Sequence, residues 1–297
     1  MRTFALCLRS DLRSYTRPMS RIPHALFFSA LALSACTETH PAETVAARTV
    51  TTPTEAPIPR ERNAIDAVPE TPGDPVEVEL TTSDGFTIHG TLTPGLSASP
   101  AVVLVHQLGS TRAEWTTLIE RLHVAPPITV LAIDLRGHGA SMAGPDGPID
   151  VGQFDAAQWA ATSNDVLGAV AYLRSNPNGL SPQRIGLVGA SIGSTATILA
   201  AASDPTLDTI VTLSPGRAYR GVDAITPAIG LGHRHLLSLA ASGEADSIEA
   251  SSAFVRITTG EELVLDGNDH GVALLAAHPE AMTRVDTFLR ASLLASE

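Results

Sequence analysis

Residues 189–193 read Gly-Ala-Ser-Ile-Gly and place Ser191 between two unlike stretches of sequence. The apolar run 184–188 before them is typical of a short strand, and the Ala-rich run 194–202 after them is typical of a helix. A serine on a sharp turn from strand to helix exposes its hydroxyl, as a nucleophile requires. Glycines flank the serine because side chains there would collide with the adjoining strand and helix. The stretch therefore predicts that Ser191 is a nucleophile.

The rest of the chain predicts a mostly parallel sheet with helices on both sides. Residues 76–80 and 86–92 alternate apolar and polar side chains around a turn, which indicates an antiparallel hairpin at the N-terminal side. Continuous apolar runs follow, as expected of parallel strands buried on both faces, and helical patterns separate most of them. The runs lie at 101–105, 128–133, 185–188, 210–213, 236–240 and 262–265, and the helical patterns at about 112–123, 162–175, 192–203, 247–255 and 278–294.

Composition restricts the classes of partner. The chain has 297 residues, its 19 basic residues are all Arg, and its net charge is −12. No basic cluster lies outside the N-terminal stretch, so binding of nucleic acid through phosphate neutralisation is not expected. The globular part also shows no metal-ligand spacing, so we expect neither a metal nor another cofactor.

The N-terminus has the pattern of a secretory signal. Five Arg precede the short apolar run 25–33, and the sequence then reads Leu-Ser-Ala-Cys at 33–36, which resembles a bacterial lipobox. We expect residues 1–35 to be removed and Cys36 to carry the lipid. The alternative is an ordinary signal peptide with a coincidental cysteine, and either Met1 or Met19 could be the start.

Residues 36–75 are rich in Thr, Pro, Glu and Ala without apolar periodicity, and they predict a disordered tether after the lipidated cysteine. The globular domain then spans 76–297. This arrangement predicts a lipid-anchored protein of the bacterial cell envelope, on the periplasmic face of either membrane or on the cell surface. The membrane partner would be reached through the lipid on Cys36. The oligomeric state is left open.

A serine nucleophile needs a base that accepts its proton and a carboxylate that orients the base. Asp246 comes shortly after the strand-like run 236–242, and His270 lies just past the last strand-like run. Ser191, Asp246 and His270 are therefore the candidate nucleophile, acid and base.

Other residues could fill two of these roles. Glu244 or Asp269 could be the acid in place of Asp246, which we favour for its offset from the end of the strand. His233 and His235 compete for the role of base, but they precede a strand instead of following it and would lie at the wrong end of the sheet.

Four motifs occur in a fixed order in the globular part. After the third strand, residues 106–109 read His-Gln-Leu-Gly, and after the fourth, residues 134–141 read Asp-Leu-Arg-Gly-His-Gly-Ala-Ser. The serine turn follows at 189–193. The last motif has two parts, Gly-x-x-Asp at 243–246 and Gly-x-x-His-Gly at 267–271, which supply the acid and the base. With these motifs the chain from about residue 76 to its end resembles the α/β hydrolase superfamily. Within it, the chain is similar to small, lid-poor serine esterases related to the dienelactone hydrolases.

The resemblance implies an α/β-hydrolase fold with a minimal cap and a triad in the order Ser, Asp, His. It implies that the backbone N–H groups of Leu108 and Ile192 form the oxyanion hole. The family often has His-Gly where this chain has His-Gln, and whether the Gln107 side chain crowds or assists the hole stays open. Dienelactone hydrolases use a cysteine nucleophile, so their particular chemistry is not carried over to Ser191.

Several other conspicuous residues are expected to be structural. His106 and His138 would be hydrogen-bonded near the site, Arg136 would anchor its loop, and Trp115 would pack in the core.

The expected substrate is a small or medium acyl ester. Residues 214–234 are too few for a cap domain and predict a loop with one short helix, which leaves the cleft open, and residues 141–155 could wall one side. We therefore expect a serine hydrolase that cleaves carboxylic esters or thioesters through an acyl-enzyme. The alternatives are a serine peptidase or amidase with the same triad, and a surface-binding lipoprotein without catalysis.

Overall fold

The computed structural model describes residues 71–295. The expected signal peptide, the acylated Cys36 and nearly all of the expected tether lie outside these residues. Within 71–295, no helix has the length and apolar character needed to cross a membrane.

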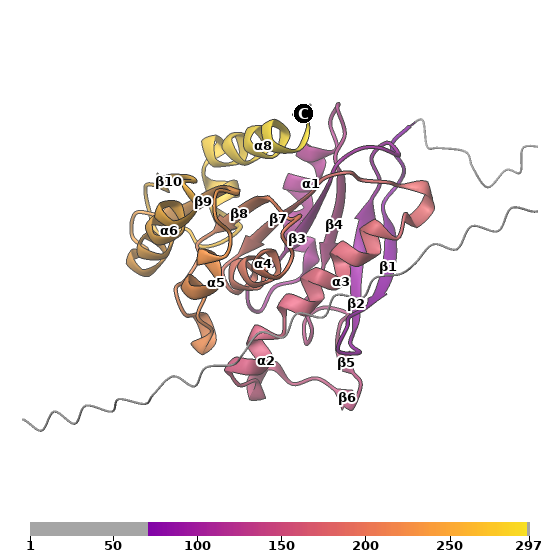
Figure 1. The fold of residues 1–297 in the computed structure, drawn as a ribbon, viewed down its shortest axis with the longest axis horizontal. Helices are drawn as coiled ribbons and strands as arrows, with labels where there is room; N and C mark the ends of the chain where they lie inside the picture. The colour runs from indigo at the N-terminus through magenta and orange to yellow at the C-terminus, as the bar shows by residue number, and fades with distance from the viewer. Residues whose placement is uncertain (1–70, 296–297) are drawn as a thin grey trace, which may run out of the picture. The chain divides into compact units, whose positions relative to one another are not determined.

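One eight-stranded sheet forms the centre of the domain, with strand order β1-β2-β4-β3-β7-β8-β9-β10 (Figure 1). The first two strands form an antiparallel hairpin, β2 pairs antiparallel with β4, and all later neighbours are parallel. The strands are β1 Val76–Thr81, β2 Thr87–Thr93, β3 Ala101–Val105, β4 Thr129–Ile133, β7 Ile185–Ala190, β8 Thr209–Leu213, β9 His235–Ala241 and β10 Glu261–Leu265. The predicted hairpin and the mostly parallel sheet are confirmed.

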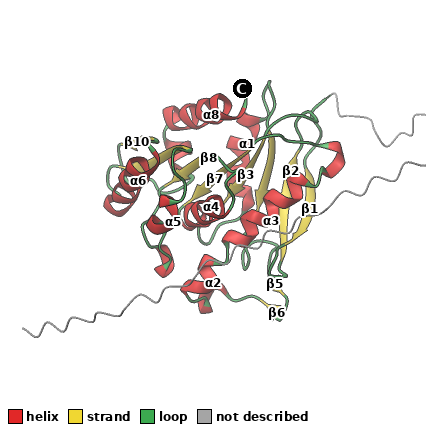
Figure 2. Cartoon of the chain, viewed as in Figure 1, coloured by secondary structure: helices red, strands yellow, loops and turns green. Residues whose placement is uncertain are grey.

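Helices cover both faces of the sheet (Figure 2). Alternate side chains of a strand point to opposite faces, so β3 contributes Val103 and Val105 to one apolar cluster and Val102 and Leu104 to the other. The first cluster packs against α3 (Ser163–Arg174), α4 (Ile192–Ser203), α5 (Ile225–Ile229) and α6 (Ala245–Thr258), and the second against α1 (Thr116–Leu122), α7 (Ala273–Ala277) and α8 (Pro279–Leu293). Trp115 is fully buried in the second cluster, in the packing role that its position predicts.

Short elements join the ends of these strands and helices. A two-stranded ladder, β5 (Ala143–Gly144) with β6 (Gly147–Pro148), and the one-turn helix α2 (Ala156–Ala160) lie between β4 and α3. These elements were not predicted, because two to five residues are too few to show a period. The parallel strands all place their carboxyl ends at one edge of the sheet, and the predicted site residues follow those ends.

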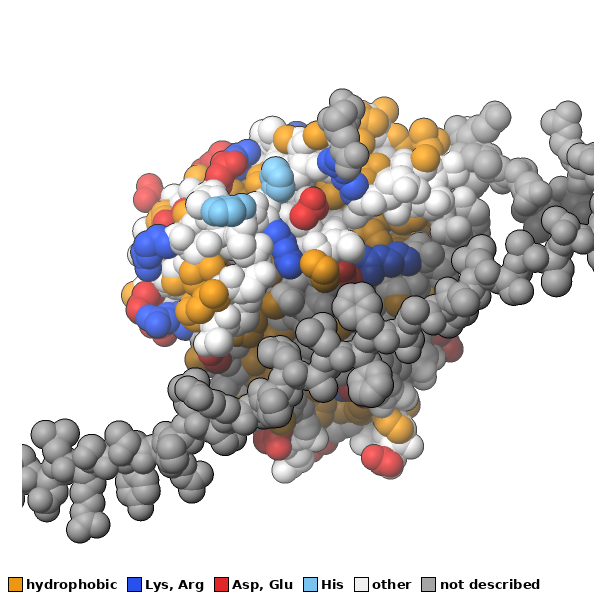
Figure 3. All heavy atoms as spheres, viewed as in Figure 1, with side chains coloured by type: hydrophobic (Ala, Val, Ile, Leu, Met, Phe, Trp, Pro, Cys, Tyr) orange, Lys and Arg blue, Asp and Glu red, His pale blue; other side chains and the backbone are white. Residues whose placement is uncertain are grey.

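Arg side chains on the face of the domain shown in Figure 3 are scattered among acidic, apolar and uncharged ones, and they do not gather into one patch.

Candidate active site

Ser191 lies in the turn between β7 and α4, with a φ of 52° and a ψ of −117°. Few non-glycine residues adopt such a conformation, and it persists only where the surroundings fix it. Here the close approach of the backbone fixes it: a Cβ on Gly189 would collide with the carbonyl of Gly193, and a Cβ on Gly193 would collide with the carbonyl of Val105. The expected role of both glycines is thus visible in the structure.

The two predicted oxyanion donors belong to the two segments that approach each other at Gly193 and Val105: Ile192 begins α4, and Leu108 lies in the loop after β3. Ile192 is the first residue of α4, so its N–H has no carbonyl partner within the helix and lies at the positive end of the helix dipole. In the facing loop, Gln107 donates its N–H to Glu114 at 2.9 Å, so that amide is already used. The Leu108 N–H is the next one along, and the Leu108 side chain is exposed. The geometry is compatible with the expected Leu108 and Ile192 pair.

The Gln107 side chain reaches from this loop to the loop that carries His270. Its Oε1 accepts the N–H of Val272 at 3.3 Å and occupies the space where Gly271 would otherwise carry a Cβ. Gly271 has a φ of 60° and no side chain, and both features permit this approach. Gln107 therefore braces the two loops against each other.

His270 bonds through Nδ1 to the carboxylate of Glu244. This contact corrects the expected acid, because Asp246 is not the partner of His270. Asp246 is already in the first turn of α6 and is exposed beside Tyr219, whereas Glu244 lies in the turn before that helix. The third candidate, Asp269, is paired with His278 at 3.4 Å. The sequence motif pointed to Asp246, and the helix was expected from about residue 247. Because α6 begins at Ala245, the carboxylate in the turn before the helix is that of Glu244.

The serine and histidine loops lie beside each other. A Cβ built on Gly271 would lie 3.5 Å from the Cβ of Ala190, so the residues next to His270 and Ser191 are near neighbours. Within residues 71–295, Ser191 and His270 share no hydrogen bond, and the nearby hydroxyl of Tyr219 bonds to the Ser214 carbonyl at 3.1 Å and to the Ser247 hydroxyl at 3.3 Å. Burial raises the pKa of Tyr219, and the nearby Glu244 adds to that rise, so the phenol stays protonated at neutral pH. Catalytic hydrogen bonds are often unformed without substrate.

His106 and His138 are internal and structural in this arrangement. The Nε2 of His106 accepts the N–H of Leu135 at 3.0 Å, which leaves Nδ1–H to donate to the carbonyl of Gln107 at 2.7 Å. Burial lowers the pKa of His106 to about 4, so the ring is neutral. It therefore joins the loop after β3 to the loop after β4. The His138 ring lies 5.0 Å from that of His106.

Arg136 anchors the loop after β4, as expected. Its guanidinium binds Asp165 and Asp84 and stacks 3.9 Å above the ring of Phe86. Burial opposes ionisation of Asp84, but bonds from Arg136, Thr82 and Asn164 outweigh it and hold the pKa of that carboxyl well below its usual range.

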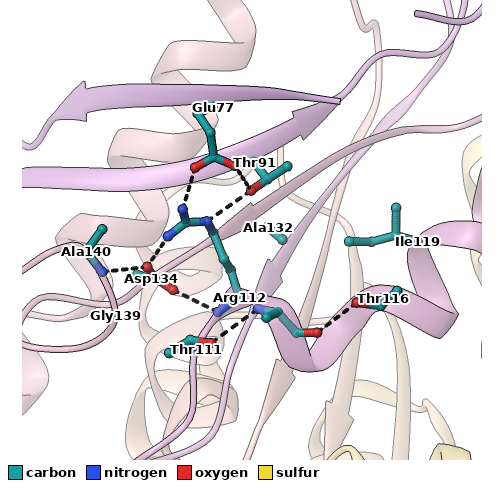
Figure 4. A pocket seen from close by; sticks show the side chains of 11 residues that line it. Glu77, Thr91, Thr111, Arg112, Thr116, Ile119, Ala132, Asp134, Gly139 and Ala140 are labelled. Carbon is teal, nitrogen blue, oxygen red and sulfur yellow. Dashed lines mark hydrogen bonds and ion pairs between the residues drawn. The ribbon is translucent and has the colours of Figure 1, made fainter. Parts of the chain in front are cut away.

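The buried carboxylate of Asp134 joins the segment after β3 to the loop after β4. Asp134 accepts N–H groups from Arg112 and Ala140, both at 2.8 Å, and pairs with the Arg112 side chain, which also pairs with Glu77 (Figure 4). These residues line a hollow of about 510 Å³. Because two carboxylates already neutralise Arg112, the hollow offers no free cation to an anionic ligand.

Only a small segment covers the Ser191 turn. Residues 214–234 form one 3₁₀ turn, Tyr219–Gly221, and the five-residue helix α5, in line with the predicted minimal cap. Side chains of this segment and of 151–160 close over Ile192 in a small apolar cluster of Trp159, Ile192 and Val222, with Phe154 and Tyr219 packed against it. Two open hollows, of about 240 and 360 Å³, flank Tyr219.

No group of three or more His, Cys, Asp or Glu side chains within residues 71–295 is arranged to hold a metal ion.

Comparison with known proteins agrees with this fold. A model of the Alpha/beta hydrolase family matches residues 102–295, and the chain belongs to this family. The comparisons thus support a hydrolase as the class of protein.

Two curated fungal proteins are similar over 139 residues, 47% of this chain: Thiohydrolase aneE from Aspergillus aculeatus, with 30% identity, and Polyketide transferase grgF from a Penicillium species, with 31% identity. The match covers only 41% and 44% of their respective lengths.

Solved structures share the fold at lower identity. The Penicillium GrgF structure aligns with a TM-score of 0.62 at 17% identity, over 75% of this chain and 100% of that one. An esterase from Pyrococcus furiosus aligns at 0.60 and 19%, over 74% and 91%. A dienelactone hydrolase from Anabaena variabilis aligns at 0.55 and 20%, over 75% and 98%.

The acid can be assigned by two isosteric substitutions. Glu244→Gln removes the charge beside His270, so kcat for any substrate whose hydrolysis uses His270 as the base should fall by about 10²-fold to 10⁴-fold. Asp246→Asn should change kcat by less than about 5-fold, since one charge lost outside the pair is worth little. Both variants should unfold near the parental urea midpoint. The reverse ranking of the two kcat values would restore Asp246 as the acid.

The buried His106 should make stability depend on pH. Its pKa is lower in the folded state than in the unfolded chain, so its contribution is complete above about pH 6.5 and is lost as pH falls toward about 4. His106→Gln should cost about 1–3 kcal/mol at pH 7, and the gap from the parent should narrow at about pH 5. Urea unfolding at both pH values measures this, with the exposed His233→Asn as control. A gap of constant size would contradict a buried neutral ring.

Proposed function

We propose that the protein is a serine hydrolase of carboxylic esters or thioesters, with Ser191 as nucleophile. The observation that carries the proposal is the bond between His270 and Glu244, in a loop that lies beside the Ser191 turn. A carboxylate on Nδ1 fixes the tautomer in which Nε2 is free to accept a proton.

The proposed reaction has two halves. His270 accepts the proton of Ser191 as the serine oxygen attacks the acyl carbon, and the N–H groups of Leu108 and Ile192 stabilise the oxyanion. When the tetrahedral intermediate collapses, His270 returns the proton to the leaving alcohol or thiol. Water then attacks the acyl-enzyme by the same route and releases the acid. The Glu244 carboxylate stabilises the charged imidazole in both halves.

Because residues 214–234 form only a small cover over the Ser191 turn, we expect a small or medium acyl group. The two hollows beside Tyr219 are open, and the partly exposed rings of Phe154 and Tyr219, which pack against the buried cluster around Ile192, are apolar surfaces that an acyl chain could contact. Thioesters are included because one similar protein is named a thiohydrolase. An ester and a thioester of the same acid give the same acyl-enzyme, since the alcohol or thiol leaves as the acyl-enzyme forms.

Ser191→Ala tests the proposal directly. Hydrolysis of a short p-nitrophenyl ester should fall by about 10³-fold or more, because the acyl-enzyme can no longer form. Labelling by a fluorophosphonate probe should vanish as well. Ser203→Ala, which removes an exposed hydroxyl from the same helix, should leave both readouts at the parental level. Retained hydrolysis in Ser191→Ala would refute the assignment, and a parent that neither labels nor hydrolyses any ester or thioester would favour a binding protein.

A further inference from the structure

Ser214 is buried at the carboxyl end of β8, with a φ of 47°. It belongs to none of the motifs in the sequence. Its N–H donates to the carbonyl of Leu239 at 2.8 Å, and Tyr219 donates its hydroxyl to the Ser214 carbonyl at 3.1 Å. Both backbone groups are thus fixed, so the side chain has a defined direction.

The Ser214 hydroxyl bridges the acid and the loop of the base. It donates its one proton to Oε2 of Glu244 at 2.6 Å and accepts the N–H of Gly271, the residue after His270, at 2.9 Å. The other oxygen of the same carboxylate is bonded to His270. One hydroxyl therefore bonds to both partners of the pair. It contacts the Glu244 oxygen that is not bonded to His270, and the backbone of the residue that follows His270.

We propose that Ser214 is a positioning residue for the Glu244–His270 pair, a role that rests on the proposed function. A carboxylate can rotate about its last bond, and the only other donor to Oε2 within residues 71–295 is the N–H of Ala241 at 3.3 Å. The short bond from Ser214 fixes that rotation and turns Oε1 toward Nδ1. The bond to Gly271 fixes the backbone from which the imidazole projects.

The same bond tunes the basicity of His270. A donor on Oε2 draws negative charge from the carboxylate, so removing it strengthens the attraction of Glu244 for a proton on His270. The other titratable groups near the pair are Tyr219 and Asp246 on the Glu244 side, and Asp269 with its partner His278 on the other. None of these contacts the Ser214 hydroxyl.

Ser214→Ala removes the hydroxyl and retains the Cβ that the strained backbone already carries. We expect kcat to fall about 10-fold to 100-fold with KM within a few-fold, as for one lost hydrogen bond to a charged group. The acid limb of the kcat/KM profile, and the pKa of His270 measured by NMR, should both move upward. Ser251→Ala is the matched control, since it also removes a fully buried hydroxyl bonded to one side chain, that of Ser238 at 2.6 Å.

A double substitution separates positioning from general loss of packing. In the Glu244→Gln background, Ser214→Ala should lower kcat by less than about 3-fold further, because the group that it positions is already lost. A parental kcat and His270 pKa in Ser214→Ala, or a full additional loss in the double variant, would overturn the role of Ser214. If Ser191→Ala retains activity, the proposed function itself fails, and the NMR shift of His270 still reports whether Ser214 acts on the pair.

Discussion

Ser191 has a positive φ in a turn where two backbone carbonyl groups fill the space that side chains on Gly189 and Gly193 would need. The absence of a Cβ at Gly193 lets the carbonyl of Val105 touch the first turn of α4, and this contact joins two neighbouring strands at their carboxyl ends. This contact therefore positions both the Ser191 turn and the loop that carries Leu108, one of the two oxyanion donors that we propose. A shift of either strand would move the serine and the Leu108 amide apart, and the hydrolysis that we propose depends on their spacing.

Around this contact, polar side chains hold each loop to the next one across the sheet edge. His106 joins the loop after β3 to that after β4, and Gln107 joins it to the loop after β10. Ser214 joins the loop after β8 to those after β9 and β10. Most of these groups are buried and hydrogen-bonded, which is the condition under which polar networks stabilise a unique arrangement. The candidate site is thus braced by short-range bonds and needs no large cap.

The sequence predicted what depends on local pattern. The buried strands, the hairpin and the serine turn follow from periodicity and glycine placement, and the structure has them close to the expected bounds. The partner of His270 was predicted as Asp246 from motif spacing, and the structure pairs it with Glu244, because the starting point of α6 decides which carboxylate faces the ring. Ser214 and the bracing role of Gln107 were not predicted, since both depend on residues distant in sequence. Hydroxyl and amide side chains carry no pattern that reveals such partners.

We propose that Ser191, His270, Glu244 and the backbone amides of Leu108 and Ile192 act together on one bound acyl group. A crystal structure of the protein after reaction with a fluorophosphonate tests it most directly, because the bound phosphonyl group mimics the tetrahedral intermediate. We expect phosphorus on the Ser191 oxygen, a phosphonyl oxygen that accepts N–H groups from Leu108 and Ile192, and Nδ1 of His270 bonded to Glu244. A phosphonyl oxygen directed away from both amides, or a His270 bonded to Asp246, would contradict it.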